Sequence, residues 1–331
     1  MRTITLEEHY ATPAFMEGPG RDLKAQAEAA RDHPRVAAGY AKLIEQLCDL
    51  DEGRIAAMDA AGIDVQVLSL TSPGAEQLDA AEAVALAREA NDTVAQAVRR
   101  HPGRLAGFAA LPTAAPETAA DELERVVGEH SFVGALINGH ARGRYLDDTF
   151  FWPILERAEA LGVPIYLHPT PPPRAVVGAS YAGSFAPGAA VGLATAAWGW
   201  HIETATHVLR LILGGVFDRY PGLQLVVGHM GEGLPFFLPR LEMTLPKEVT
   251  KLERPVGAYL RENFHYTFGG FNWTSAFLDL VLQVGVDRIM FSTDHPYASM
   301  EEARTFLEGL PVSPADKERI AHGNARRLLR L

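Results

Sequence analysis

The sequence has few of the residues that would place it outside the reducing interior of a cell. Cys48 is the only cysteine, so no disulfide can form within the chain, which fits a cytoplasmic location. The acidic opening, MRTITLEEHY, stands where a secretory signal needs an apolar run. The longest apolar stretch, Ala189–Trp200, is rich in glycine and alanine and is too short to cross a bilayer. We therefore expect no membrane partner.

An excess of positive charge is also lacking. The 30 lysine and arginine residues are outnumbered by 41 aspartate and glutamate residues, which gives a formal net charge of −11. Such a chain is repelled by nucleic acids and anionic membranes, so neither is an expected partner. Hydrophobic residues make up 47% and charged residues 21% of the 331 residues, an ordinary globular composition that argues against disorder.

Eight short runs of β-type residues alternate with longer helical stretches. The runs are Thr3–His9, Val65–Leu70, Ala106–Pro112, Gly134–Asn138, Pro164–His168, Leu223–His229, Phe264–Phe268 and Arg288–Asp294. Helical spacing is clearest in Ala80–Arg100, Pro116–Glu129 and Phe150–Leu161. This alternation predicts parallel strands joined by right-handed crossovers. Eight such units favour a closed (β/α)8 TIM barrel, with residues 1–331 as a single α/β domain.

Two connections are too long to be plain turns. One runs from Tyr10 to about Asp51, and the other from Pro169 to about Trp200, with three consecutive prolines near its start. Each follows the C-terminal end of a strand, the first and the fifth. Long loops at that end of a barrel usually build the pocket or its lid, so we expect these two to do so. Contacts between subunits are the alternative.

Polar side chains stand at the ends of four predicted strands. Glu7 and His9 end the first strand on one face, because side chains alternate along a strand. His168 ends the fifth strand, His229 the sixth and Asp294 the eighth. The C-terminal ends of barrel strands meet at one mouth, and imidazole with carboxylate suits Zn²⁺, Mn²⁺ or a similar divalent ion. We therefore predict a metal site there, with a polar plug of the mouth as the alternative.

These features resemble the amidohydrolase superfamily, whose barrels carry metal ligands on strands 1, 5 and 8. The superfamily usually begins with His-x-His on strand 1, whereas Glu7-x-His9 resembles its nonoxidative decarboxylases, the relatives of aminocarboxymuconate-semialdehyde decarboxylase. The likeness is greatest to the γ-resorcylate (2,6-dihydroxybenzoate) decarboxylases and related ortho-hydroxybenzoate decarboxylases. The motifs that carry it are LEEH (6–9), INGH (137–140), GRYLDD (143–148), YLHP (166–169), GHMGE (228–232), STD (292–294) and NARRL (324–328).

The resemblance implies a single divalent ion, Zn²⁺ or Mn²⁺. None of the five lysines lies at a strand end, and the fourth strand ends in Asn138, so the carboxylated lysine of dinuclear amidohydrolases is missing. The four implied ligands are Glu7, His9, His168 and Asp294.

The implied reaction converts an ortho-hydroxybenzoate to a phenol and CO2, and it is reversible at high bicarbonate. An aryl anion is too unstable to form directly, so the ring is protonated first at the carbon that bears the carboxylate. Asp294 is the first candidate for the proton donor. His229 and Glu232 form a hydrogen-bonded relay in this interpretation, and Glu232 otherwise caps the following helix.

Four more residues are candidates for binding a small aromatic carboxylic acid. Arg240 matches a family position that binds substrate, within the chain or across a subunit boundary, and is otherwise a surface arginine. Asn138 either bonds a ring hydroxyl, orders the relay or ends its strand. Phe15, from the first long loop, is a candidate to stack on the ring. His295 stands where the family has an aromatic residue, which leaves the exact hydroxybenzoate open.

The other histidines are expected to be structural. We predict packing or interface roles for His201 and His207, and solvent-facing positions for His33, His101, His130 and His322. Family likeness implies a homodimer or homotetramer. The alternative function is a metal-dependent hydrolase of a lactone, ester or amide, which would need a metal-activated water and a base. A barrel without catalytic activity is the third hypothesis.

Overall fold

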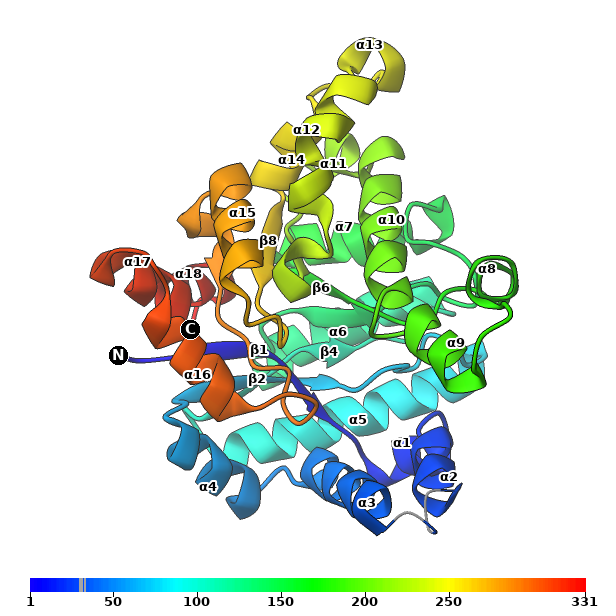
Figure 1. Ribbon diagram of the computed structural model, residues 1–331, viewed down its shortest axis with the longest axis vertical. Helices are drawn as coiled ribbons and strands as arrows, with labels where there is room; N and C mark the ends of the chain where they lie inside the picture. The colour runs from blue at the N-terminus through cyan, green and yellow to red at the C-terminus, as the bar shows by residue number, and fades with distance from the viewer. Residues whose placement is uncertain (30–31, 33) are drawn as a thin grey trace.

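In the part of the chain that the structure describes, nine short parallel strands lie at the centre, and helices surround them (Figure 1). The structure is a computed structural model that describes residues 1–29, 32 and 34–331, so the predicted exposure of His33 lies outside the described residues. The strands are β1 (Ile4–Tyr10), β2 (Val65–Leu70), β3 (Leu105–Gly107), β4 (Ala109–Ala110), β5 (Ala135–Asn138), β6 (Ile165–His168), β7 (Leu225–Val227), β8 (Phe264–Thr267) and β9 (Ile289–Met290).

The strands form the predicted TIM barrel. One sheet has the order β1-β2-β3 and the other runs from β4 to β9. A parallel bridge between Leu6 and Ser292 joins them on one side. On the other side, β3 and β4 are pieces of one segment, interrupted at Phe108, whose N–H donates to the carbonyl of Leu68 at 2.9 Å. The third predicted strand, 106–112, is therefore split, because its first piece pairs with β2 and its second with β5.

Helices cover the outside of the barrel. Helix α5 shows why: Asp79 caps it by accepting the N–H of Glu82, and buried residues such as Ala83 and Leu86 line one face. The helices that follow the strands are α4 (Glu52–Ala61), α5 (Ala80–Arg100), α6 (Pro116–His130), α7 (Trp152–Leu161), α10 (Gly199–Leu213), α11 (Val216–Arg219), α12 (Leu234–Thr244), α13 (Lys247–Thr250), α14 (Val256–Glu262), α15 (Thr274–Val284), α16 (Met300–Gly309), α17 (Pro314–Glu318) and α18 (Asn324–Leu329).

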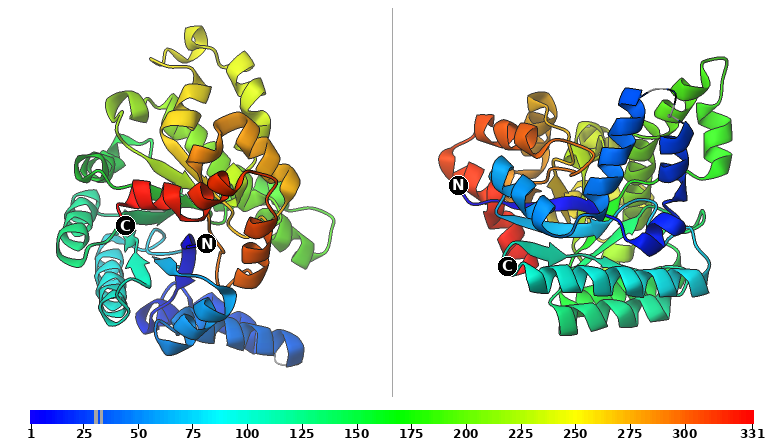
Figure 2. Two further views of the ribbon diagram at one scale, coloured as in Figure 1. Left: turned by 90° about the vertical axis from the view of Figure 1, so that its left-hand side faces the viewer. Right: turned by 90° about the horizontal axis from the view of Figure 1, so that it is seen from below.

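The N-terminal end of the barrel is filled by apolar side chains. Ile4, Val65 and Val226 belong to one buried cluster there, together with Ala325 and Leu329 from α18. The left view of Figure 2 shows the C-terminal helices lying across the end at which the chain enters the barrel. A cavity for chemistry must therefore lie at the opposite end.

The two long connections fold into short helices at that opposite end. The first holds α1 (Pro13–Glu17), α2 (Arg21–Ala29) and α3 (Pro34–Cys48), and the second holds α8 (Arg174–Val176), a π-helical turn η2 (Val177–Tyr181) and α9 (Pro187–Ala194). In Figure 1, α9 lies above α1 and α2, on the same side of the molecule. Both connections line the same cavity, as predicted. Among the described helices, none is long and apolar enough to cross a membrane.

Candidate active site

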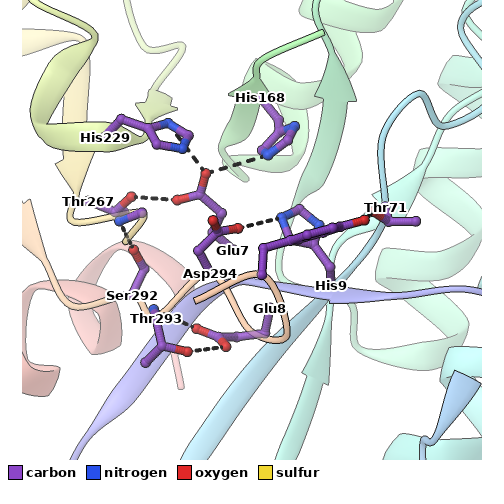
Figure 3. Close-up of polar contacts among 12 residues, drawn as sticks. Glu7, Glu8, His9, Thr71, His168, His229, Thr267, Ser292, Thr293 and Asp294 are labelled. Carbon is purple, nitrogen blue, oxygen red and sulfur yellow. Dashed lines mark hydrogen bonds and ion pairs between the residues drawn. The ribbon is translucent and has the colours of Figure 1, made fainter. Parts of the chain in front are cut away.

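Four side chains from three parts of the barrel meet at its C-terminal mouth (Figure 3). Glu7 and His9 come from β1, His168 ends β6, and Asp294 follows β9. One potential ligand atom from each lies within 4.8 Å of the others. Nε2 of His9 is 3.1 Å from Oδ1 of Asp294, and Nε2 of His168 is 3.6 Å from Oε1 of Glu7. These are the four residues for which the sequence predicted metal binding.

The backbone at the site is unusual. The pairing of β1 with β2 shifts register between Thr5 and Glu8, and Glu7 has a φ of 67°. Asp294, His229 and Glu232 also have positive φ values, of 60°, 49° and 56°. Non-glycine residues in this left-handed region cost on the order of 1–3 kcal/mol each. A bulge of this kind changes the direction of a side chain. We infer that the free-energy cost is tolerated because it directs these groups toward the mouth of the barrel.

The donor set fits a divalent cation. Oε1 of Glu7 and both ring nitrogens of His9 are buried and have no hydrogen-bond partner among the described residues. Burial lowers the pKa of His9 to about 3, and burial also lowers the pKa of His168 well below its usual range. Both rings are therefore neutral, which is the form that binds a metal ion. Together with two carboxylates they would satisfy Mn²⁺ or Zn²⁺.

Neighbouring side chains orient these ligands. Nδ1 of His168 donates to Oδ1 of Asn138 at 3.0 Å, which leaves Nε2 free on the side of the cluster. Oε2 of Glu7 accepts hydrogen bonds from the hydroxyls of Tyr166, at 2.5 Å, and Thr267, at 3.2 Å. Burial raises the pKa of Glu7 to about 7, against the opposing charge of His229. Asn138 thus supports a ligand rather than facing the cavity.

Glu8 points to the other face of β1, as strand alternation predicts. Its Oε1 accepts the N–H of Thr293 at 2.9 Å, and its Oε2 accepts the hydroxyl of the same residue at 2.6 Å. Because Thr293 precedes Asp294, these bonds tie the last ligand to the strand that carries Glu7 and His9.

A second cluster lies beside the first, on the segment after β7. Nδ1 of His229 donates to Oε1 of Glu232 at 2.7 Å, so the predicted pair is formed. Burial lowers the pKa of His229, but the carboxylates of Glu232 and Glu7 outweigh it and raise the pKa to about 10. Burial raises the pKa of Asp294 to about 7, although the charge of His229 opposes this rise. The pocket therefore holds one cationic imidazole and a carboxyl group that can carry a proton near neutral pH.

His201 is part of this cluster, which corrects its predicted packing role. Its Nδ1 lies 2.5 Å from Oε2 of Glu232, and its Nε2 lies 2.9 Å from the carbonyl of Ala196. Both partners are hydrogen-bond acceptors, so a ring nitrogen that carries a proton has an acceptor to donate to on either side. His201 begins α10, and no pattern in the sequence links it to Glu232, 31 positions further on. His207 does pack in the core, where its Nε2 accepts the N–H of Leu146 at 2.9 Å.

A cavity of about 640 Å³ borders the two clusters and is lined by residues of both long connections. His168, His229, Asp294 and His201 line it. Its walls include side chains that the sequence did not single out for binding: Leu23, Gln26, Pro171, Trp200, Phe271, Trp273 and Tyr297.

Four predicted substrate-binding residues do not line this cavity. Phe15 is fully buried in the core beneath the first loop, because α1 turns its apolar side toward the barrel. His295 is buried and is not among the residues that line the cavity. Arg240 is exposed on α12. Asn138 is buried behind His168.

We expect His201→Ala to impair catalysis without removing the metal ligands. The change deletes a charged hydrogen bond to Glu232, of a kind worth about 1.5–3 kcal/mol, so kcat/KM should fall roughly 10- to 100-fold. Steady-state kinetics with saturating Mn²⁺ would measure this. His140→Ala is the matched control, because its ring also holds the second long connection, through the carbonyl of Pro171 at 3.1 Å, without touching Glu232. Equal losses in both variants would show that His201 only anchors the loop.

The comparisons with known proteins agree with this geometry. A family model described as Amidohydrolase matches residues 44–331. Gamma-resorcylate decarboxylase from Polaromonas sp. strain JS666 is 38% identical, over 99% of this chain and 98% of the relative. The relative from Rhizobium radiobacter with the same name is 35% identical over the same shares.

Solved structures are similar over the whole chain. A dihydroxybenzoic acid decarboxylase from Polaromonas sp. JS666, with bound manganese and the inhibitor 2-nitroresorcinol, has a TM-score of 0.88 at 37% identity, covering 100% of this chain and 97% of its own. A 2,6-dihydroxybenzoate decarboxylase complexed with 2,6-dihydroxybenzoate has a TM-score of 0.86 at 34% identity, covering 100% of both chains. The likeness therefore includes every element that supplies a residue to the site.

Proposed function

The chain belongs to the amidohydrolase family and is a carboxy-lyase within it, and from this premise we propose that Asp294, His229 and Glu232 decarboxylate a 2,6-dihydroxybenzoate-like acid. The observation that carries the proposal is the position of Asp294. This carboxyl group belongs to the four-ligand cluster and also lines the cavity. The carboxyl group of Asp294 can therefore contribute both to metal binding and to proton transfer toward an aromatic ring in the cavity.

A divalent ion belongs to this site, and Glu7, His9, His168 and Asp294 would hold it. When bound, it supplies positive charge that favours an ionised ortho hydroxyl and holds the carboxylate beside it. Manganese is the metal bound in the solved relative, and the choice between Mn²⁺ and Zn²⁺ in this chain stays a proposal. The aromatic walls of the cavity, which include Phe271, support binding of the ring.

The residues of the chain move one proton. Asp294 donates it to the ring carbon that bears the carboxylate, and the ortho phenolate supplies the electron pair for the new C–H bond. The bond between that carbon and the carboxylate then breaks, its electrons restore the aromatic ring, and CO2 leaves. Glu232 holds the imidazole of His229 in a fixed orientation, and His229 lines the cavity as a cation that balances the negative charge of the substrate.

The direct test is CO2 release from 2,6-dihydroxybenzoate, with 2,3-dihydroxybenzoate and 2-hydroxybenzoate for comparison. We expect release of one CO2 for each phenol formed, with about one metal ion per chain by elemental analysis. In D2O the phenol should carry one deuterium, at the carbon that lost CO2. Metal without CO2 from any of these acids would contradict the proposed substrate class. Acid release from a neutral ester or lactone would instead support the alternative, a hydrolase.

Two further properties of the protein stay predictions. The predicted homodimer or homotetramer is supported by exposed apolar side chains on α12 near Arg240, namely Phe236, Phe237 and Met243. Association through this face would bury these side chains. Because Arg240 does not line the cavity of its own chain, such an interface would also be needed for it to reach a substrate, in a neighbouring copy. A cytoplasmic location is supported by the single cysteine.

A further inference from the structure

A buried carboxylate with no role so far lies two hydrogen bonds away from the cluster. Glu76 follows β2, in the turn before α5, and is 1% exposed. Its Oε1 accepts the backbone N–H of Asn138 at 2.8 Å. Its Oε2 has no hydrogen-bond partner among the described residues, and no cation is among the groups that shift the pKa of Glu76.

Keeping Glu76 buried costs free energy that no neighbouring cation returns. Burial raises the pKa of Glu76 to about 7, and hydrogen bonds from Asn138 oppose the rise. A glutamine or an apolar side chain would fill the space at lower cost. The carboxylate is therefore best explained by what it does to its neighbour.

The carboxylate faces the amide of Asn138. Gly74 shows this, because a Cβ added there would lie 2.2 Å from Oε2 of Glu76 and 2.5 Å from Nδ2 of Asn138. The two atoms thus border the same small space. Since a carboxylate only accepts hydrogen bonds, the NH2 group of the amide is held on the side of Glu76. Oδ1 of Asn138 is then left to face Nδ1 of His168, at 3.0 Å.

We propose that Glu76 is a positioning residue: it sets the direction of the Asn138 amide and thereby leaves Nε2 of His168 free to bind the metal ion. An amide turned the other way would present its NH2 group to Nδ1, and the proton of the neutral ring would move to Nε2, which could then not bind a metal. The inference rests on the proposed function, because it takes His168 as a ligand.

The test is the affinity of the metal-free full-length protein for Mn²⁺, measured by isothermal titration. Glu76→Gln keeps the size of the side chain but places an NH2 group toward the amide, which favours the turned orientation. We expect the dissociation constant for Mn²⁺ to rise roughly 10- to 100-fold, the usual effect of losing a group that orients a ligand.

A double variant makes the test specific. In Glu76→Gln with Asn138→Asp, the introduced glutamine donates to the introduced aspartate, whose second oxygen accepts from Nδ1 of His168. The direction of the hydrogen bonds from residue 76 through residue 138 to His168 is restored, so most of the Mn²⁺ affinity should return. A role limited to packing predicts no such rescue, because two changes in the core would disturb it more than one.

Glu122→Gln is the matched control, since Glu122 is also buried and its Oε1 accepts from the amide of Asn91 at 2.9 Å, outside the site. It should change the melting temperature but not the affinity for Mn²⁺. Unchanged affinity in Glu76→Gln, or no rescue in the double variant, would overturn the role of Glu76 alone. A wild-type protein that binds no Mn²⁺ would overturn the metal assignment as well, and with it the proposed function.

Discussion

Replacing Asp294 by asparagine should abolish measurable decarboxylation while the protein still folds. The amide cannot donate an acidic proton, and general acid catalysis contributes roughly 10²- to 10⁴-fold to a rate. The asparagine amide is also a weaker metal ligand than a carboxylate. The fall in kcat should therefore be at least as large as the loss of general acid catalysis alone. Kinetics at increasing Mn²⁺ would separate the two effects, because added metal restores occupancy but not the proton.

Asp92→Asn is a suitable control, since Asp92 is half exposed and paired with Arg125 at 2.9 Å, outside the site. It should keep the wild-type rate. If Asp294→Asn also keeps a rate near that of the wild type at saturating Mn²⁺, the proton comes from elsewhere, and His229 becomes the first alternative because it is cationic and lines the same cavity.

Replacing His168 by alanine should release the metal and, with it, the activity. The change removes one of four ligands, so the affinity for Mn²⁺ should fall by more than the roughly 10- to 100-fold that loss of a ligand's supporting partner costs. Metal content after gel filtration and the dissociation constant for Mn²⁺ would both report it. Added imidazole should restore part of the affinity if the alanine leaves room for it.

His207→Ala is the control for this loss. His207 is also a buried histidine, 1% exposed, but it bonds the backbone of Leu146. We expect lower thermal stability and unchanged metal content. Retention of metal in His168→Ala, or its loss in His207→Ala, would show that the ligand set is wrong.

Strand ends were the most predictable part of this protein. A polar residue that closes an apolar run lies at the mouth of the barrel, and this placed Glu7, His9, His168, His229 and Asp294 there. The resemblance selected four of them as ligands, and the positive φ values of Glu7 and Asp294 could not be predicted from alternation. The resemblance to decarboxylases supplied the substrate class, which geometry alone does not contain. Both long connections also line the cavity, as their position after strands 1 and 5 indicated.

Residues beyond the strands could not be placed in this way. The direction of Phe15 depends on how α1 packs, and the partner of His201 depends on the angle at which α10 leaves the barrel. Both are set by tertiary contacts rather than by local spacing. Glu76 left no signal either, since a glutamate in a turn is ordinarily exposed to solvent.

Apolar side chains fill the foot of the barrel, and the cavity lies at the other end, where residues of α2 and α9 contribute to its walls. We expect the acid to enter, and both the phenol and CO2 to leave, between the segments that carry α2 and α9. CO2 is small enough to diffuse past a bound phenol, whereas we expect the phenol to leave only when these segments separate. We therefore expect an ordered release, with CO2 first and the ring last, and a turnover rate that depends on solvent viscosity. In the carboxylation direction, the same order means that the phenol binds before CO2.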